Sequence, residues 1–440
     1  MKWDKDKILI LFFKEHNAMK KSNILLGCVA DDFTGASDAA SFLRSAGLRV
    51  TMCTGLPKDS TEIADCDAVV IALKCRSTPA AEAVRDCTEA FRWLLAVGAK
   101  QLYYKYCSTF DSTREGNIGP VMDAALSELG EKYTILCPAL PVNGRTVKNG
   151  RLFVGGVPLH LTHMKDHPVN PMWASDISEL MCEQSKYPCH VVTIEDMLAG
   201  QEHVESMLER FSTQSEHFYI IPDYFEQEHN ELIYSLFGGV KILSGGSGLL
   251  AAVNPNCKKA LADNVSCTAA GKSILLAGSC SSMTLRQITD YKADHSAIKI
   301  DPMKAIDGTQ SSVSLWEEVA GRDGVLLYSS ESAQEISRIP DALRPQVSAA
   351  LEKLISELAL MAEKDGYTQI IVAGGETSGA VAKALDFGAY LIGESVAPGV
   401  PVMMPVKKPE LRLVLKSGNF GREDFFHAAL EMTTKGRRGI

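Results

Sequence analysis

Short apolar runs alternate with longer segments of helical spacing over the first 140 residues of the chain. Apolar runs bounded by turn residues predict buried strands, which we expect at residues 24–29, 49–54, 68–73, 101–106 and 133–137. Helical spacing lies between them, at residues 36–46, 80–97 and 121–129. This alternation predicts an α/β fold, in which a mostly parallel sheet carries helices on both faces.

The pattern then breaks and resumes. Residues 140–175 are rich in Pro, Gly, Asn and His without clear periodicity, which predicts a long irregular segment of the kind that is usually functional. The alternation returns near residue 190, and a low-periodicity stretch at 252–272 follows. Further strands are expected at 273–277, 324–328, 369–372, near 402 and at 411–415, with helices at 283–291, 345–364 and 378–385.

We therefore predict two domains, each with a Rossmann-like parallel sheet. The expected divisions are an N-terminal extension over residues 1–22, a first domain over 23–258 and a second over 270–440. At 440 residues and 46% hydrophobic composition, the chain is long enough for two separate cores.

Charge and cysteine content narrow the class of protein. The formal net charge of -9 argues against nucleic-acid or anionic-membrane partners, because such proteins usually carry a basic excess. No apolar run is long enough to span a membrane. The 12 cysteines are scattered singly, which is typical of reduced thiols in a cytoplasmic protein. The sequence leaves a homodimer open.

Residues 30–36 read Ala-Asp-Asp-Phe-Thr-Gly-Ala and join the first expected strand to the first expected helix. Asp31 and Asp32 therefore lie at the carboxyl end of a parallel strand, where ligands bind in open α/β sheets. The alternative is that one of them only caps the helix.

Cations follow the neighbouring strands. Lys74, Arg76, Lys105 and Arg145 each come soon after an expected strand. Strand ends of one sheet converge at one edge, so these side chains could face the two aspartates and bind a carboxylate or phosphate. Scattered surface charge is the alternative. Residues 105–119 form a dense polar loop, and within it Ser108 and Asp111 are candidate substrate-binding residues.

Three loops of the second half are rich in small residues and follow strands. They are residues 278–282 (Gly-Ser-Cys-Ser-Ser), 373–380 (Ala-Gly-Gly-Glu-Thr-Ser-Gly-Ala) and 416–421 (Lys-Ser-Gly-Asn-Phe-Gly). Backbone N–H groups at such turns, together with a helix N-terminus, can cradle a phosphate. A complete Gly-x-Gly-x-x-Gly fingerprint is absent from the sequence, which disfavours a dehydrogenase.

A metal site has weaker support. His160, His163, Asp166 and His167 lie close in sequence, but their spacing matches no tight template, and we predict no protein metal site.

Beyond these patterns, the chain resembles the four-carbon acid sugar kinase family, and most closely its 3-oxo-tetronate 4-kinases. The matching segments run in order through both halves, at residues 27–38, 72–77, 105–120, 138–155, 245–249, 278–281, 374–379 and 416–421. One segment departs from the family pattern, since residues 167–172 read His-Pro-Val-Asn-Pro-Met where His-Pro-Leu-Thr-Pro-Met is expected.

The resemblance implies an N-terminal domain for the acid sugar, a C-terminal domain for ATP, and an active site between them. The implied ATP contacts fall on Ser279 or Ser281, on Gly374, Gly375, Glu376 and Thr377, and on Gly418. Magnesium would bridge the phosphates. Arg76, Lys105 and Arg145 would pair with the substrate carboxylate or the phosphoryl group, and Asp32 or Asp31 would act on the attacking hydroxyl.

The expected activity is thus ATP-dependent phosphorylation of the 4-hydroxyl of a four-carbon sugar acid, in carbohydrate acid catabolism. The first choice is 3-oxo-tetronate, with D-threonate or D-erythronate as alternatives. A non-catalytic sensor of nucleotide or sugar acid is the rival from another class. Two adjacent aspartates count against that rival, because they would weaken simple anion binding.

Overall fold

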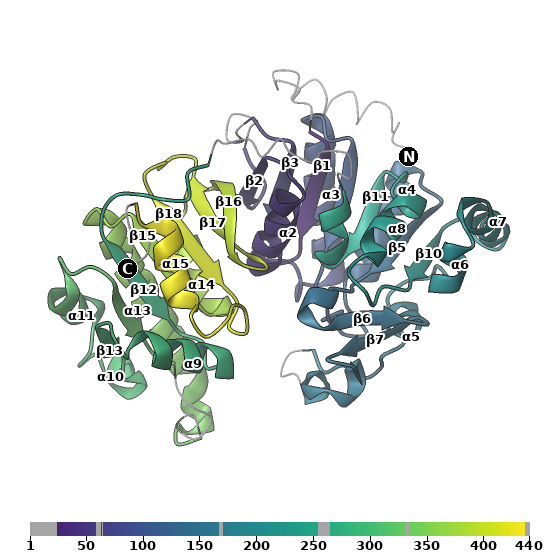
Figure 1. Cartoon of the computed structure of the whole chain (residues 1–440). Coiled ribbons are helices and arrows are strands. Elements are labelled where there is room, and N and C mark those ends of the chain that lie inside the picture. The colour runs from purple at the N-terminus through teal and green to yellow at the C-terminus, as the bar shows by residue number, and fades with distance from the viewer. Residues whose placement is uncertain are drawn as a thin grey trace, which may run out of the picture. The chain divides into compact units, whose positions relative to one another are not determined.

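A computed structural model of the chain describes residues 24–58, 63, 65–166, 170–253, 265–330, 335 and 337–435. Its internal contacts divide the chain into two compact units, Met1–Leu261 (unit 1) and Ala262–Ile440 (unit 2) (Figure 1). The expected N-terminal extension and most of the expected boundary segment lie outside the described residues.

Unit 1 contains an eight-stranded sheet in which every pairing is parallel. Its strands are β1 (Leu26–Ala30), β2 (Val50–Thr54), β3 (Ala68–Ala72), β4 (Gln101–Lys105), β5 (Tyr133–Cys137), β9 (Cys189–Val192), β10 (Phe218–Pro222) and β11 (Ile242–Gly245). The spatial order is β2-β3-β1-β4-β11-β5-β10-β9. All residues of β1, β3 and β10 are buried, as expected for strands covered on both faces.

The helices of unit 1 connect successive strands of this sheet (Figure 1). They are α2 (Phe33–Ser45), α3 (Ala80–Ala96), α4 (Ile118–Leu129), α5 (Ile177–Cys182), α6 (Ile194–Leu198), α7 (Gln201–Ser212) and α8 (His229–Phe237). Helix α2 begins three residues earlier than its spacing predicts, because Asp32 caps it. The short helices α5, α6 and α8 are missing from the sequence-based prediction.

The prediction for residues 140–175 is wrong in part. This segment contains a small antiparallel sheet of β6 (Arg145–Lys148), β7 (Arg151–Val154) and β8 (Val157–Pro158). It also holds the 3-10 turns η2 (Pro141–Asn143), η3 (Leu159–Leu161) and η4 (His163–Asp166). Strands this short give too few alternating positions for a period to be visible.

Unit 2 contains a seven-stranded mixed sheet. Its strands are β12 (Ser273–Ala277), β13 (Ala297–Lys299), β14 (Val325–Tyr328), β15 (Gln369–Ala373), β16 (Ala389–Ala397), β17 (Val400–Pro405) and β18 (Arg412–Lys416), in the order β13-β14-β12-β15-β18-β17-β16. The first five are parallel, whereas β18, β17 and β16 pair antiparallel. The sequence analysis missed β13 and β16.

The helices of unit 2 are α9 (Ser282–Tyr291), α10 (Pro302–Asp307), α11 (Ser312–Val319), α13 (Arg344–Lys364), α14 (Gly375–Leu385) and α15 (Phe425–Thr433). Tyr291, Phe425 and Phe426 join α9 and α15 to the sheet in one buried apolar cluster. Helices α10, α11 and α15 were not predicted. None of the helices that the structure describes has the length and apolar character of a membrane span.

Candidate functional site

Asp31 and Asp32 follow β1, the strand between β3 and β4. Asp32 is the N-cap of α2, and its Oδ1 accepts a hydrogen bond of 2.6 Å from the Gly35 N–H. Asp31 is almost fully buried. Of the two aspartates, Asp32 is therefore the one that caps the helix. Its side chain also contacts Arg76.

Arg76 gathers three carboxylates at the end of β3. Its Nε and Nη2 donate to Asp31 Oδ2 and Oδ1, each at 2.8 Å, and Nη2 lies 3.0 Å from Asp32 Oδ1. Asp111 Oδ2 lies 3.7 Å from Nη1. Burial raises the pKa of the Asp31 carboxyl, and the Arg76 charge and hydrogen bonds oppose that rise. The charge of Arg76 is thus largely compensated within the protein.

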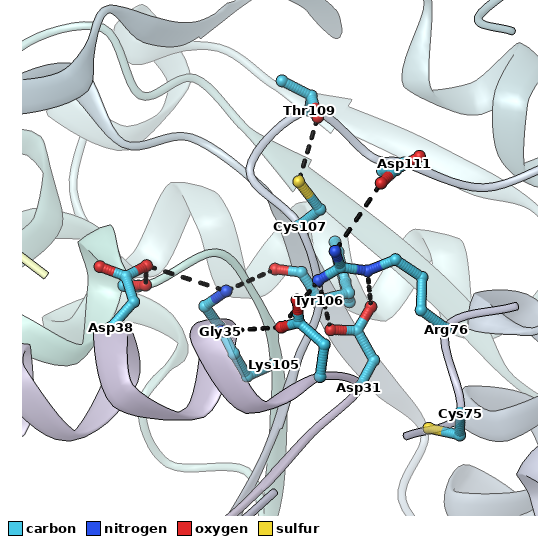
Figure 2. Close-up of polar contacts among 12 residues, drawn as sticks. Asp31, Gly35, Asp38, Cys75, Arg76, Lys105, Tyr106, Cys107, Thr109 and Asp111 are labelled. Carbon is cyan, nitrogen blue, oxygen red and sulfur yellow. Dashed lines mark hydrogen bonds and ion pairs between the residues drawn. The ribbon is translucent and has the colours of Figure 1, made fainter. Parts of the chain in front are cut away.

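Lys105 forms a second polar group beside the first turn of α2 (Figure 2). Its buried ammonium donates to Tyr106 O at 2.9 Å and lies 3.9 Å from Asp38 Oδ2. Ser247 Oγ donates to the same Asp38 oxygen. Burial raises the pKa of Asp38, and the charge of Lys105 and the Ser247 hydrogen bond oppose the rise. A Cβ at Gly35 would lie 3.3 Å from the Lys105 Nζ, so the ammonium borders a helix N-terminus.

The remaining candidate residues of unit 1 make fewer contacts with the two aspartates and Lys105. Arg145 opens β6 and donates through Nη1 to Asn143 O, and its charge opposes the rise in the pKa of Asp38. Ser108 is half-buried in the turn after β4. Asp111 in the same loop accepts a 2.8 Å hydrogen bond from the Asn170 amide, which fixes the carboxylate near Arg76.

In unit 2 the three small-residue loops meet. They follow β12, β15 and β18, which are adjacent in the sheet. The Gly278 N–H donates to Ala373 O at 3.0 Å, and the Gly374 N–H donates to Lys416 O at 2.9 Å. Gly374 has φ of 134°, and a Cβ there would lie 2.8 Å from Thr377 Oγ1 and 3.1 Å from the Ser279 nitrogen. Only glycine suits this position.

Hydroxyls and helix N-termini line the meeting point. Ser281 caps α9 and donates from Oγ to Gly418 O at 2.7 Å, while Ser279 Oγ accepts from the Ser281 N–H at 3.2 Å. Gly374 is the N-cap of α14, so Gly375, the exposed Glu376 and the buried Thr377 form the first turn of that helix. Two helix N-termini and a set of small side chains therefore converge in unit 2, as an anion site requires.

Several polar residues at these sites escaped the list of candidates. Asp38 and Ser247 meet only through the fold, because 209 residues separate them. Asn170 lies in the segment that departs from the family pattern. Ser329 and Ser330 follow β14 and are buried, and their hydroxyls have no hydrogen-bond partner among the described residues. Two serines directly after an expected strand were a signal that could have identified this last pair.

The histidines singled out in the sequence do not assemble in the part of the chain that the structure describes. His160 Nδ1 contacts Ser175 Oγ at 2.7 Å, and His167 lies outside the described residues. Ligand atoms of a different set, Asp294, His295 and His427, lie within 4.8 Å of one another where α9 and α15 pack. His427 forms ion pairs with Asp290 and Asp294, at 3.4 and 3.7 Å. We therefore interpret this cluster as part of the packing between the two helices.

Comparison with known protein families matches both units. A family described as a sugar-binding N-terminal domain matches residues 26–253, and one described as a nucleotide-binding C-terminal domain matches residues 274–426. The Brucella melitensis 3-oxo-tetronate kinase is 40% identical, over 93% of this chain and 96% of its own length. The Haemophilus influenzae 3-oxo-tetronate kinase is also 40% identical, over 93% of this chain and all of its own length.

Solved structures agree at the level of the fold. A crystal structure of a Salmonella typhimurium protein, provisionally described as a tRNA synthase, has a TM-score of 0.86 and 36% identity over 93% of this chain and 99% of its own. A Haemophilus influenzae crystal structure has a TM-score of 0.79 and 38% identity over 92% of this chain and 99% of its own. Both likenesses extend through the two units.

Proposed function

The chain belongs to the four-carbon acid sugar kinase family, and we propose that it transfers the γ-phosphoryl group of ATP to the terminal (4-) hydroxyl of 3-oxo-tetronate. The product is 3-oxo-tetronate 4-phosphate, formed in the catabolism of a carbohydrate acid. D-threonate and D-erythronate are the alternative acceptors. We also propose a cytoplasmic location, consistent with cysteines that are free throughout the described chain.

The observation that carries the proposal is the meeting of three glycine- and serine-rich loops at the N-termini of α9 and α14. Backbone N–H groups and helix dipoles at such a place favour a polyphosphate. The described residues fit a nucleotide: Ser279 and Ser281 offer hydroxyls, and Gly374 and Gly418 keep the loops free of bulk. We propose that Mg²⁺ is carried by the phosphate oxygens, where it neutralises charge as the phosphoryl group moves.

The acceptor would bind in unit 1. Its carboxylate would lie against the Lys105 ammonium and the N-terminus of α2, with Arg145 as a second cation. Arg76 is a weaker candidate for this role, because Asp31, Asp32 and Asp111 already surround it. We assign Arg76 the task of holding these carboxylates in place. Ser108 and Asp111 lie on the loop that would cover the sugar carbons.

Asp32 is the better candidate for the base of the two aspartates. Its side chain is 30% exposed, whereas that of Asp31 is 3% exposed and is bound on both oxygens by Arg76. The contacts of Asp32 with Gly35 and Arg76 are both made by Oδ1. Oδ2 can therefore accept the proton of the substrate hydroxyl.

The proposed reaction needs no reactant other than ATP and the sugar acid. The acceptor oxygen bonds to the γ-phosphorus, the bond from that phosphorus to the β–γ bridging oxygen breaks, and ADP leaves. The hydroxyl proton passes to Asp32. Because this transition state demands mainly positioning and charge stabilisation, the two sites must come together for turnover. The location of the site between the two domains stays a prediction.

A coupled ADP-release assay tests the proposal. Purified protein is given magnesium-ATP and, in separate reactions, 3-oxo-tetronates, threonate and erythronate. We expect turnover on the 3-oxo acid, with a higher kcat/KM than on either alternative. Preference for threonate or erythronate would correct the acceptor but keep the reaction. ATP binding without turnover on any acid would contradict the proposal and favour the non-catalytic sensor.

A further inference from the structure

We propose that Lys416 is the positioning residue of the nucleotide loop in unit 2, and that its buried charge is balanced only when nucleotide phosphates bind. The inference rests on the proposed nucleotide site and adds a residue and a proton linkage to it. Lys416 ends β18, and its buried ammonium donates to two backbone carbonyls of loop 417–421. It would act through the loop, without a contact to the reacting atoms.

Three neutral acceptors surround the ammonium. Lys416 Nζ donates to Gly418 O at 2.9 Å, to Thr284 Oγ1 at 3.1 Å and to Ser417 O at 3.2 Å. An ammonium has three N–H donors, so all of them are used. Thr284 belongs to α9, and the other two acceptors belong to the loop. The lysine therefore ties the loop after β18 to the helix whose N-terminus forms part of the predicted anion site.

Gly418 is the centre of this connection. Its carbonyl accepts from Ser281 Oγ at 2.7 Å and from Thr284 Oγ1 at 2.9 Å in addition to the lysine. Three donors on one carbonyl hold the peptide plane firmly, and hence fix the direction of the N–H groups that follow in the loop. Loss of the ammonium would remove one of the three donors and loosen the loop.

No carboxylate among the described residues pairs with Lys416. The acids on the neighbouring segments are engaged elsewhere or exposed: Glu423 pairs with Arg286 at 3.2 Å, Asp424 pairs with Arg422 at 2.8 Å, and Glu376 of α14 is exposed. On α9 and α15, Asp290 faces His427. The Phe425 ring centroid lies 5.4 Å from Nζ. Lys416 is 1% exposed, so water does not replace the missing counter-charge.

This arrangement couples nucleotide binding to a proton. Burial lowers the pKa of Lys416 from 10.5 to about 7, and no charge in the described part of the chain opposes that effect. A polyphosphate above the loop would favour the ammonium and raise the pKa again. The protein would then take up a proton on binding nucleotide at pH above about 7, and affinity would fall as pH rises.

Calorimetry of ADP binding tests the linkage directly. ADP is titrated into the full-length protein at pH about 8 in two buffers of different ionisation enthalpy, Tris and HEPES, and the proton uptake is taken from the difference in heat. We expect about half to one proton per ADP for the parent protein, and an affinity that falls up to tenfold between pH of about 7.5 and 8.5.

Three variants separate positioning from a general structural role. We expect Lys416→Met to bind ADP roughly tenfold or more weakly without proton uptake, while Lys416→Arg restores much of the affinity but not the uptake, because arginine does not titrate. Arg412→Met is the matched control. Arg412 opens the same strand, and its guanidinium donates to the carbonyl oxygens of Ser266, Pro409 and Leu411. It lies about 13 Å from Lys416 along the strand. Arg412→Met should take up as many protons per bound ADP as the parent protein does.

The experiments distinguish a failure of the role of Lys416 from a failure of the proposed kinase activity. ADP binding by the parent protein without proton uptake, in an enzyme that turns over its acid, would overturn the role of Lys416 and leave the kinase proposal standing. Unchanged uptake in Lys416→Arg would overturn it as well. Failure of the parent to bind any nucleotide and to release ADP in the assay would overturn both proposals.

Discussion

Two buried lysines occupy equivalent places in the two units. Lys105 ends β4 and Lys416 ends β18, each in the interior of a sheet, and they are 2% and 1% exposed. Each ammonium donates to the carbonyl of the next residue, Tyr106 or Ser417. They differ in their counter-charges. Lys105 lies 3.9 Å from Asp38, whereas the partners of Lys416 among the described residues are hydroxyl and carbonyl oxygens.

The difference shows how one architecture serves two kinds of ligand. The strand ends of unit 1 combine cations with Asp31, Asp32, Asp38 and Asp111, a mixture suited to a hydroxy acid that must be both bound and deprotonated. The strand ends of unit 2 combine a cation, helix N-termini and hydroxyls with little acid nearby, which suits a polyphosphate. Variants that alter one environment and leave the other intact test whether the two are chemically separate.

The largest expected effect is on catalysis in unit 1. Asp32→Asn should lower kcat by about 10²- to 10⁴-fold, because the amide cannot accept the hydroxyl proton. Asparagine still caps a helix, so α2 and the position of residue 32 should survive. ADP affinity should not change. The measurement is steady-state ADP release, paired with ADP calorimetry.

Asp31→Asn is the control for that variant. Its carboxylate is buried against Arg76, so we expect a loss of stability in addition to any loss of rate. If Asp32→Asn retained parental kcat while Asp31→Asn did not, the assignment of the base would pass to Asp31.

The second effect is on the stability of unit 1. Arg76→Met leaves Asp31 buried without its partner, which should cost about 3–5 kcal/mol. Hydrogen exchange should show the loss in β1 and β3 but not in the strands of unit 2. Arg49→Met is a matched control, since Arg49 binds Asp67 through the same two-point geometry but is 32% exposed. It should cost about 1 kcal/mol or less. Equal losses in the two variants would contradict the importance of burial at Arg76.

Local sequence patterns predicted the parallel strands other than β13, together with the strand ends that carry polar residues. Asp31, Arg76 and Lys105 come together because β3, β1 and β4 are neighbours, which the β–α alternation implies without fixing the order. Long-range pairings were beyond such patterns. The Asp38–Ser247 contact joins distant segments, and β16 pairs with β17 in a hairpin with register shifts that disturb its alternation.

The third effect separates the two lysines. Lys105→Met should raise the KM for the acid roughly tenfold to a hundredfold, because it removes a charged hydrogen-bond donor from the proposed carboxylate site. ADP affinity should stay at the parental value. Lys416→Met should instead lower the affinity for ADP and leave the KM for the acid at the parental value. Kinetics with varied acid and calorimetry with ADP, run on both variants, check the pairing of lysine and ligand. A change in ADP affinity for Lys105→Met as large as that for Lys416→Met would show that the two environments are not separate.

The smallest effect is the contribution of Lys416 to the pH dependence of stability. The pKa of Lys416 is about 7 in the folded protein, below its usual 10.5. Between these two values the unfolded chain holds the proton that the folded chain has lost, so unfolding takes up a proton and the free energy of unfolding rises with pH. Below about pH 7 both states are protonated and this contribution is flat. The slope for one proton is about 1.4 kcal/mol per pH unit.

Other titrating groups also contribute to the slope, so the informative quantity is the difference between the parent and Lys416→Met in urea unfolding at pH of about 6, 7, 8 and 9. That difference should be constant from pH 6 to 7, then shift in favour of the parent by about 1 kcal/mol per unit above pH 7. The same series on Arg412→Met should stay parallel to the parent, since arginine remains charged throughout. A parallel series for Lys416→Met would mean that the ammonium keeps its proton although no carboxylate of the described residues pairs with it. In that case the three neutral acceptors alone would suffice to hold a charge in the interior, and the contrast with Lys105 would lie in ligand choice rather than in protonation.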